Sequence, residues 1–187
     1  MFGRIFVSHE LEDAMITLLE TWFYTALTEV TIQLGLDIND FPLPTRYTNR
    51  NTFDAALGEQ LPRVVVIAGG MTRPPRRDGG GGYTGWWKID VGIAAAHEDE
   101  VEVRRRVGMY AAAIRWIVMH KPSLGGFCNN SEFVDERPAE VFAPDQLLQY
   151  RAMVVSFECE VPNIVLDHPV QMFLIHLLIL RILDHIL

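Results

Sequence analysis

The spacing of apolar residues predicts two long amphipathic helices in this chain. The first begins at Ser8, a favourable N-cap followed by acidic residues, and Gly35 is a natural stop. The second follows the acids at 98–100 and ends before Pro122. Each has one apolar stripe with steps of three and four, formed by Leu11, Met15, Leu18, Trp22, Ala26 and Val30 and by Val103, Val107, Tyr110, Ala111 and Ile114.

Shorter patterns between and after the helices predict β-strands. Residues 61–70 hold a β-branched run closed by two glycines, which is typical of a buried strand. Residues 83–96 and 147–161 alternate with a period of two, and 133–142 and the polar stretch 46–52 are weaker strands. The expected inward faces consist of Trp87, Ile89, Val91 and Ile93 and of Met153, Val155, Phe157 and Cys159.

This order of elements predicts an α+β fold, in which two α-helices pack on one face of a mainly antiparallel β-sheet. A length of 187 residues suits one domain, which we place at residues 1–161. Residues 162–187 form an apolar extension that we expect to be helical and to form an interface.

The extension ends in a strongly apolar segment, residues 172–187. On a helix its polar residues Arg181, Asp184 and His185 form a narrow stripe. Most of the helix surface is therefore apolar and must be buried against another surface. The segment is shorter than the roughly 20 residues that span a bilayer, and its charges would lie inside the membrane. We therefore expect no membrane as partner and predict packing on a neighbouring subunit or neck protein, with burial in the domain's own core as the alternative. The expected anchors are Phe173, Leu177, Leu180 and Leu183.

Residues 72–82 predict a mobile loop. They hold two prolines, four consecutive glycines and the three arginines Arg73, Arg76 and Arg77. Such a segment buries little apolar area, and its glycines lose much entropy on ordering. We expect it to be disordered in free subunits and to order, at least partly, on assembly. Its charge suits phosphate or an acidic surface of a neighbouring subunit, and a solvated loop without a partner is the alternative.

Net charge and cysteine content exclude several classes of protein. A net charge of −8 argues against non-specific coating of nucleic acid, which needs a positive field. Two cysteines are too few for a disulfide framework or a four-thiolate zinc site, so we expect both to be reduced. No basic region followed by a long apolar core marks a signal peptide at the N-terminus.

Candidate catalytic groups are few. The acids at 98–100 and 135–136 are sequence neighbours at helix or turn boundaries, where the helix dipole and solvation account for them. No histidine has metal-ligand spacing, and glycines 79–82 lack the lysine and hydroxyl that a phosphate-binding loop needs. We therefore expect no catalytic residue, cofactor or metal; a small hydrolase using His97 and the acids beside it is the alternative.

Further interface candidates come from an arginine trio and an aromatic cluster. The arginines at 104–106 either pair with Glu100 and Glu102 on their helix or contribute to an interface. The aromatic residues at 83–87 lack the interleaved basic residues of a single-strand nucleic-acid binder, so we expect core or interface packing. The complete interface candidates in the domain are Arg73, Arg76, Arg77, Trp86, Arg104 and Arg105.

Five features follow one another along residues 9–161: a helix over 10–32, the run 60–67, a strand ending at 90–96, a charged helix over 100–120 and a closing strand over 150–161. In the order of these elements and in their sequence character they resemble the tail terminator and tail-completion proteins at the neck of long-tailed bacteriophages. The glycine-rich stretch at 73–82 and the apolar extension depart from that family's pattern.

The resemblance implies a structural protein, not an enzyme, that forms a ring, usually a hexamer. Such a ring caps the tail tube and joins it to the head, so the implied partners are further copies of the chain, the tail tube protein and the head connector or head-closure protein. It would be assembled in the host cytoplasm and lie at the tail–neck junction of the virion. Genomic DNA would pass through only transiently, and a negative net charge suits such a channel. A head-closure or head–tail connector protein is the alternative within the same neck.

Overall fold

The elements of the chain appear in the predicted order. The computed structural model describes residues 8–49, 61–78, 82–139 and 148–164. In chain order the elements are α1 (Ser8–Leu34), the 3-10 turn η1 (Ile38–Asp40), β1 (Arg46–Thr48), β2 (Arg63–Arg77), β3 (Tyr83–His97), α2 (Glu100–His120), the 3-10 turn η3 (Leu124–Gly126), β4 (Asn130–Ala139) and β5 (Gln149–Ile164).

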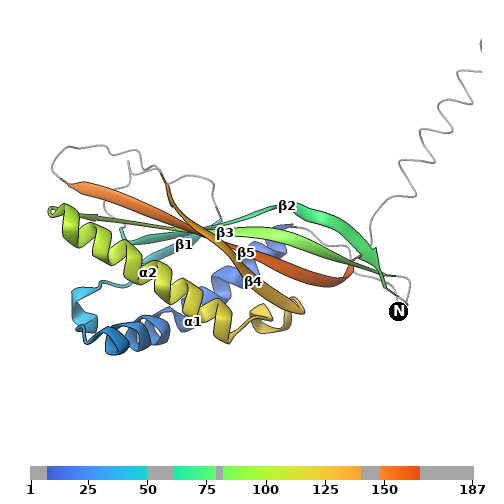
Figure 1. Ribbon diagram of the computed structural model, residues 1–187, viewed down its shortest axis with the longest axis horizontal. Helices are drawn as coiled ribbons and strands as arrows, with labels where there is room; N and C mark the ends of the chain where they lie inside the picture. Colours follow the sequence, from blue (N-terminus) through green and yellow to red (C-terminus); the bar gives the residue numbers. More distant parts are fainter. Residues whose placement is uncertain (1–7, 50–60, 79–81, 140–147, 165–187) are drawn as a thin grey trace, which may run out of the picture.

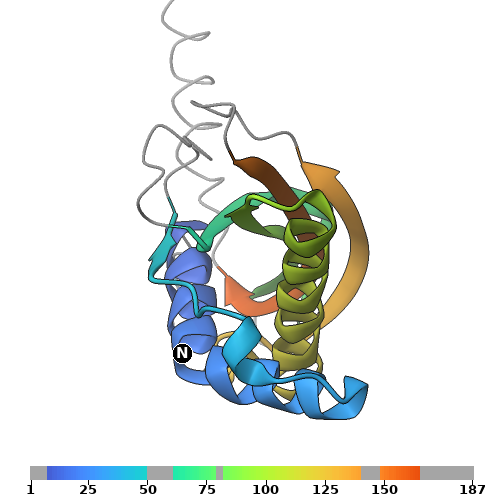
Figure 2. The same cartoon turned by 90° about the vertical axis from the view of Figure 1, so that its left-hand side faces the viewer.

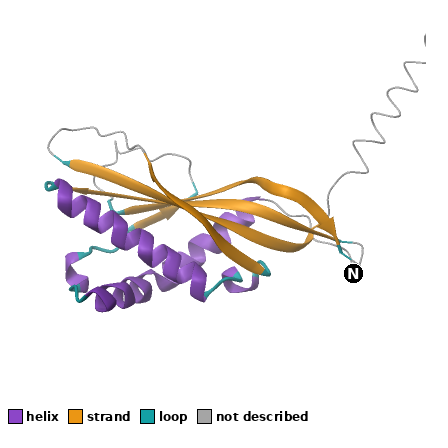
Figure 3. Ribbon diagram, in the orientation of Figure 1, coloured by secondary structure: helices purple, strands orange, loops and turns teal. Residues whose placement is uncertain are grey.

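One five-stranded sheet with two helices on one face makes up the fold, as predicted. Its strand order is β1-β2-β3-β5-β4. All neighbouring strands are antiparallel except β1 and β2, which are parallel over three residues. Figure 3 shows both helices on the same side of the sheet, and the end-on view in Figure 2 shows the sheet curving over α2. The fold is therefore α+β with a single helical layer.

The core lies between the sheet and the helices. The central strands bury the alternate residues that the sequence predicts, because Ile89, Val91, Val155 and Phe157 have no exposed surface. In α1, Phe23 enters this core, while the predicted stripe residue Trp22 lies at its margin and is only partly buried. The inward faces of β3 and β5 are thus confirmed, and the stripe of α1 is shifted by one position at this turn.

The helix ends follow local sequence signals. Asp99 caps α2, because its carboxylate accepts hydrogen bonds from the amides of Val101 at 2.7 Å and Glu102 at 3.5 Å. Gly35 follows α1 with a φ of 66°, a left-handed conformation that a residue without Cβ adopts easily. β5 continues to Ile164, beyond the predicted domain boundary at residue 161.

The predicted mobile loop at 72–82 is wrong for residues 72–77, which belong to β2. Arg73 pairs in register with Trp86, and Arg77 with Tyr83, with three register shifts along the way. Prolines are tolerated there because β1 pairs with β2 only as far as Val65, so the rest of β2 is an edge. Residues 79–81 lie outside the described residues. Figure 1 shows β2, β3 and β5 running on beyond both helices as a projecting arm.

Candidate interface

The projecting arm brings three predicted interface residues together. The guanidinium of Arg73 lies 4.4 Å from the centre of the Trp86 ring, and that of Arg76 lies 5.7 Å from it. Arg73 also forms an ion pair with Glu158 of β5, whose carboxylate accepts a hydrogen bond from Thr72. These contacts lie on the face of the sheet opposite the helices, because Trp86 and Glu158 alternate along their strands with Trp87 and Cys159, which face the core. Cation–π contacts with Trp86 therefore hold two of the three arginines of the arm close to the sheet, Arg73 at the shorter distance.

A polar network on the same outer face was not predicted from the sequence. Arg137 donates to Asp90 at 3.1 Å and to the hydroxyl of Ser156 at 2.9 Å, and that hydroxyl donates to Asp90 at 2.5 Å. Asp135 also accepts from Arg137, and the hydrogen bond of Ser156, followed by the charge of Arg137, lowers the pKa of Asp135. The alternation of the strands could have indicated it, since Asp90 and Ser156 both fall on the expected polar face.

Arg104 and Arg105 do not join the arm, because they begin α2, which follows the far end of β3. Arg104 pairs with Glu100 at 2.9 Å, as the helical spacing predicts, and Arg105 pairs with Glu102 at 3.0 Å. Arg151 of β5 also donates to Glu100 at 2.7 Å, and that bond is the main cause that lowers the pKa of Glu100. Both arginines, Arg104 and Arg105, therefore have ion-pair partners within their own subunit.

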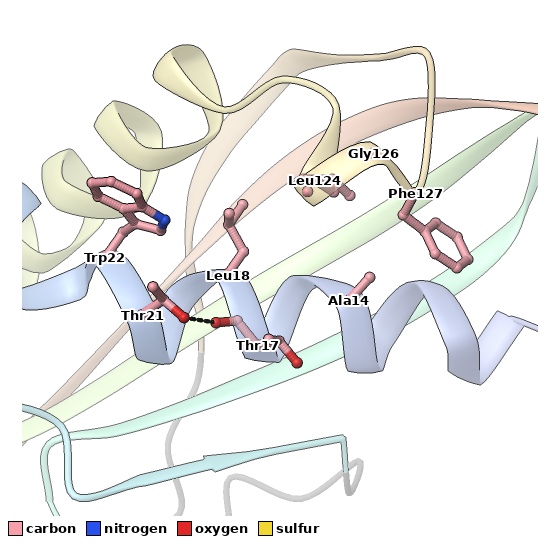
Figure 4. A pocket seen from close by; sticks show the side chains of 9 residues that line it. Ala14, Thr17, Leu18, Thr21, Trp22, Leu124, Gly126 and Phe127 are labelled. Atoms are coloured by element: carbon pink, nitrogen blue, oxygen red, sulfur yellow. Dashed lines mark hydrogen bonds between the residues drawn. The ribbon is translucent and has the colours of Figure 1, made fainter.

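A groove runs along α1 where η3 packs beside it. It has a volume of about 530 Å³ and lies between α1 and η3, with Trp22 and Phe127 at its two ends in Figure 4. Its hydroxyls donate to the preceding turn of α1: Thr17 to the carbonyl of Asp13 at 2.8 Å, and Thr21 to that of Thr17 at 2.7 Å. No titratable side chain lines it within the described part of the chain.

The groups of the enzyme alternative have other partners in the fold. Nδ1 of His97 accepts a hydrogen bond of 3.0 Å from the backbone N–H of Asp99, and Asp99 is the N-cap residue of α2. The separate pair of neighbouring acids, Asp135 and Glu136, is divided between two faces, since Asp135 pairs with Arg137 on the outer face and Glu136 pairs with Arg115 of α2. Among the described residues, no three histidine, cysteine or acidic side chains are grouped so that they could hold a metal ion.

The two cysteines, which the sequence leaves unrelated, are neighbours in the core. Both thiols are free and buried, with Cys159 facing inward beside Phe157 as the strand pattern predicts. A hydrogen bond between them, together with burial, raises the pKa of Cys159, and the same bond lowers the pKa of Cys128. Cys128 also donates to the carbonyl of Pro122 at 3.4 Å.

No protein-family model matches the sequence, and a search of curated proteins finds no match. Neither described helix is both long and apolar enough to cross a membrane. The predicted anchors of the extension, Phe173, Leu177, Leu180 and Leu183, lie outside the described residues.

Proposed function

We propose that this chain is a structural protein of a phage neck, of the tail-terminator type, that forms a ring capping the tail tube and joining it to the head connector. The observation that carries the proposal is the sheet, in which β2, β3 and β5 leave the helical layer as the projecting arm and whose two edges, the open part of β2 and β4, are unlike. Each subunit of a closed ring needs two different and complementary surfaces, because every copy contacts its two neighbours through opposite faces.

The element order of residues 9–161 supports the same proposal through its resemblance to tail terminator and tail-completion proteins. Within the described residues, the contacts of the arm are of the kind found at protein interfaces, with arginine and tryptophan stacked on an open surface. A protein that acts by binding and assembly needs such surfaces and does not need a catalytic group.

The test is the mass of the assembled protein and its effect on tail tubes. Native mass measurement at micromolar concentration should find a discrete species, most simply at six times the 21.3 kDa chain mass. Added to polymerising tail tube protein, that species should stop elongation and remain at one tube end. A strictly monomeric protein would overturn the proposal. A ring that binds tailless heads but not tubes would identify a head-closure protein instead.

A further inference from the structure

We propose that neighbouring copies of this chain join edge to edge, with the basic end of β2 of one copy docked on the acidic β4 edge of the next. The basic end of β2 is residues 71–77, and the acidic β4 edge is residues 132–136. The inference rests on the proposed ring and specifies which surfaces close it. A second copy is the occupant because the two surfaces lie on opposite edges of one sheet and carry opposite charge.

The basic end of β2 presents charge that its own copy does not neutralise. Arg73 is already paired with Glu158. Arg76 and Arg77 are exposed, and within the described residues neither forms an ion pair. Met71, at the start of this segment of β2, keeps 40% of its surface exposed, although it is a large apolar residue. This end therefore offers two positive charges that no carboxylate among the described residues pairs with, one of them lying over Trp86, and an exposed apolar side chain.

The acidic β4 edge is the counterpart on the other side of the sheet. Glu132 is exposed, and its contact among the described residues is with the side-chain amide of Asn130 at 3.2 Å. Phe133 and Val134 are 48% and 54% exposed, and Met119 of the adjacent α2 is 71% exposed. The acidic β4 edge thus complements the basic end of β2 in charge, and both surfaces also expose apolar side chains. Protein interfaces combine these features as an apolar centre and a polar rim.

Side chains, rather than backbone pairing, must make this contact. Pro74 and Pro75 have no N–H to give to a neighbouring strand, and Pro138 interrupts β4 in the same way. The register shift between Phe133 and Asp135 places a bulge at Val134. Such features protect sheet edges from indiscriminate pairing. Charge complementarity then selects the correct partner, because two basic ends or two acidic edges repel each other.

Charge reversal on each side tests the contact. Arg76→Glu with Arg77→Glu makes both surfaces acidic, and Glu132→Arg reverses the β4 charge, so each variant alone should need about tenfold or more protein to assemble. Glu29→Arg, on the exposed face of α1, is the matched control and should assemble like the wild type. Far-ultraviolet circular dichroism and melting curves check that all variants fold.

Mixing the variants is the decisive step. In an equimolar mixture of the two variants, each reversed surface meets an opposite charge, so alternating rings should form that neither variant forms alone. The triple variant carrying all three changes should also recover assembly. A wild-type ring that is indifferent to these changes overturns the contact alone. A wild-type chain that stays monomeric at every concentration overturns the proposed function and this contact with it.

Discussion

At the residue scale, Tyr110 connects the helical layer to the segment that follows α1. Its ring is fully buried and lies 6.0 Å from that of Phe23, and its hydroxyl donates to the carbonyl of Pro42 at 2.6 Å. A buried hydroxyl with a single strong partner contributes to stability mainly because its loss leaves the acceptor unsatisfied.

Tyr110→Phe should therefore lower the free energy of unfolding by about 1 kcal/mol, since the ring packing stays and the carbonyl of Pro42 loses its donor. Urea denaturation measures the change. Tyr24→Phe is the matched control, because Tyr24 is 59% exposed, and it should leave stability unchanged. Equal stability of the two variants would show that the bond to Pro42 contributes nothing.

Alkaline pH gives a second prediction for the same group. Burial raises the pKa of Tyr110 in the folded protein above the ordinary value of about 10 that applies after unfolding. The folded state thus holds the proton more tightly, so this contribution is complete below about pH 10 and is lost as the pH rises further. The unfolding free energy of the wild type should fall more steeply above pH 10 than that of Tyr110→Phe. Parallel curves would contradict the expectation.

At the element scale, the sequence predicts the regular elements well and the arm poorly. Caps, stops and period-two alternation identify α1, α2, β3 and β5 because these signals are local. Residues 72–77 carry the local composition of a loop, and only pairing with β3, which no local pattern reveals, makes them a strand. Prolines are permitted in these residues because they form an edge of the sheet. A loop-like composition is therefore compatible with a strand here, and only the tertiary pairing decides between the two.

The tip of the arm depends on close approach at Gly85. A Cβ added there would lie 2.7 Å from Cδ1 of Ile164 and 3.0 Å from Nε1 of Trp87. Gly85→Ala should therefore destabilise the protein by about 1 kcal/mol, since the buried side chain of Ile164 must shift. Gly70→Ala on β2 is the control, because nothing lies within 4 Å of its added Cβ. Melting temperatures compare the two, and an unaffected Gly85 variant would mean that Ile164 moves freely.

The arginines of the arm should matter for docking and not for folding. Replacing Arg73, Arg76 and Arg77 by serine removes exposed groups, and the ion pair lost with Arg73 is half exposed on the arginine side. The melting temperature of the subunit should stay close to that of the wild type, while ring formation or tube capping should weaken. A triple variant that unfolds would show that these side chains hold the arm to the sheet.

At the scale of the whole molecule, the candidate interface was predictable only in part. The sequence identifies Arg73, Arg76 and Trp86, but their convergence requires the register of β2 and β3. Arg104 belongs to a separate ion-pair cluster at the other end of β3. The network of Asp90 and Ser156 joins strands that are distant in sequence, so strand order had to be known first.

The apolar extension makes the last prediction, which concerns assembly. A chain ending at Ile164 keeps the whole of β5, including the buried side chain of Ile164 itself. The residues removed include Phe173, Leu177, Leu180 and Leu183, and burying each such side chain stabilises a contact by roughly 1.5–3 kcal/mol before ordering costs. We therefore expect a folded protein that loses ring formation or partner docking, as measured by circular dichroism and native mass.

A full-length chain with Leu177→Asp and Leu180→Asp separates apolar contact from chain length. It should fail to assemble in the same way as the truncated chain, because charge at two anchor positions opposes burial as strongly as their absence. If both proteins form wild-type rings, the extension has no role in the interface between subunits. If both lose the folded state, the segment belongs to the core of its own domain, and the charge-matched edges of the sheet must close the ring without it.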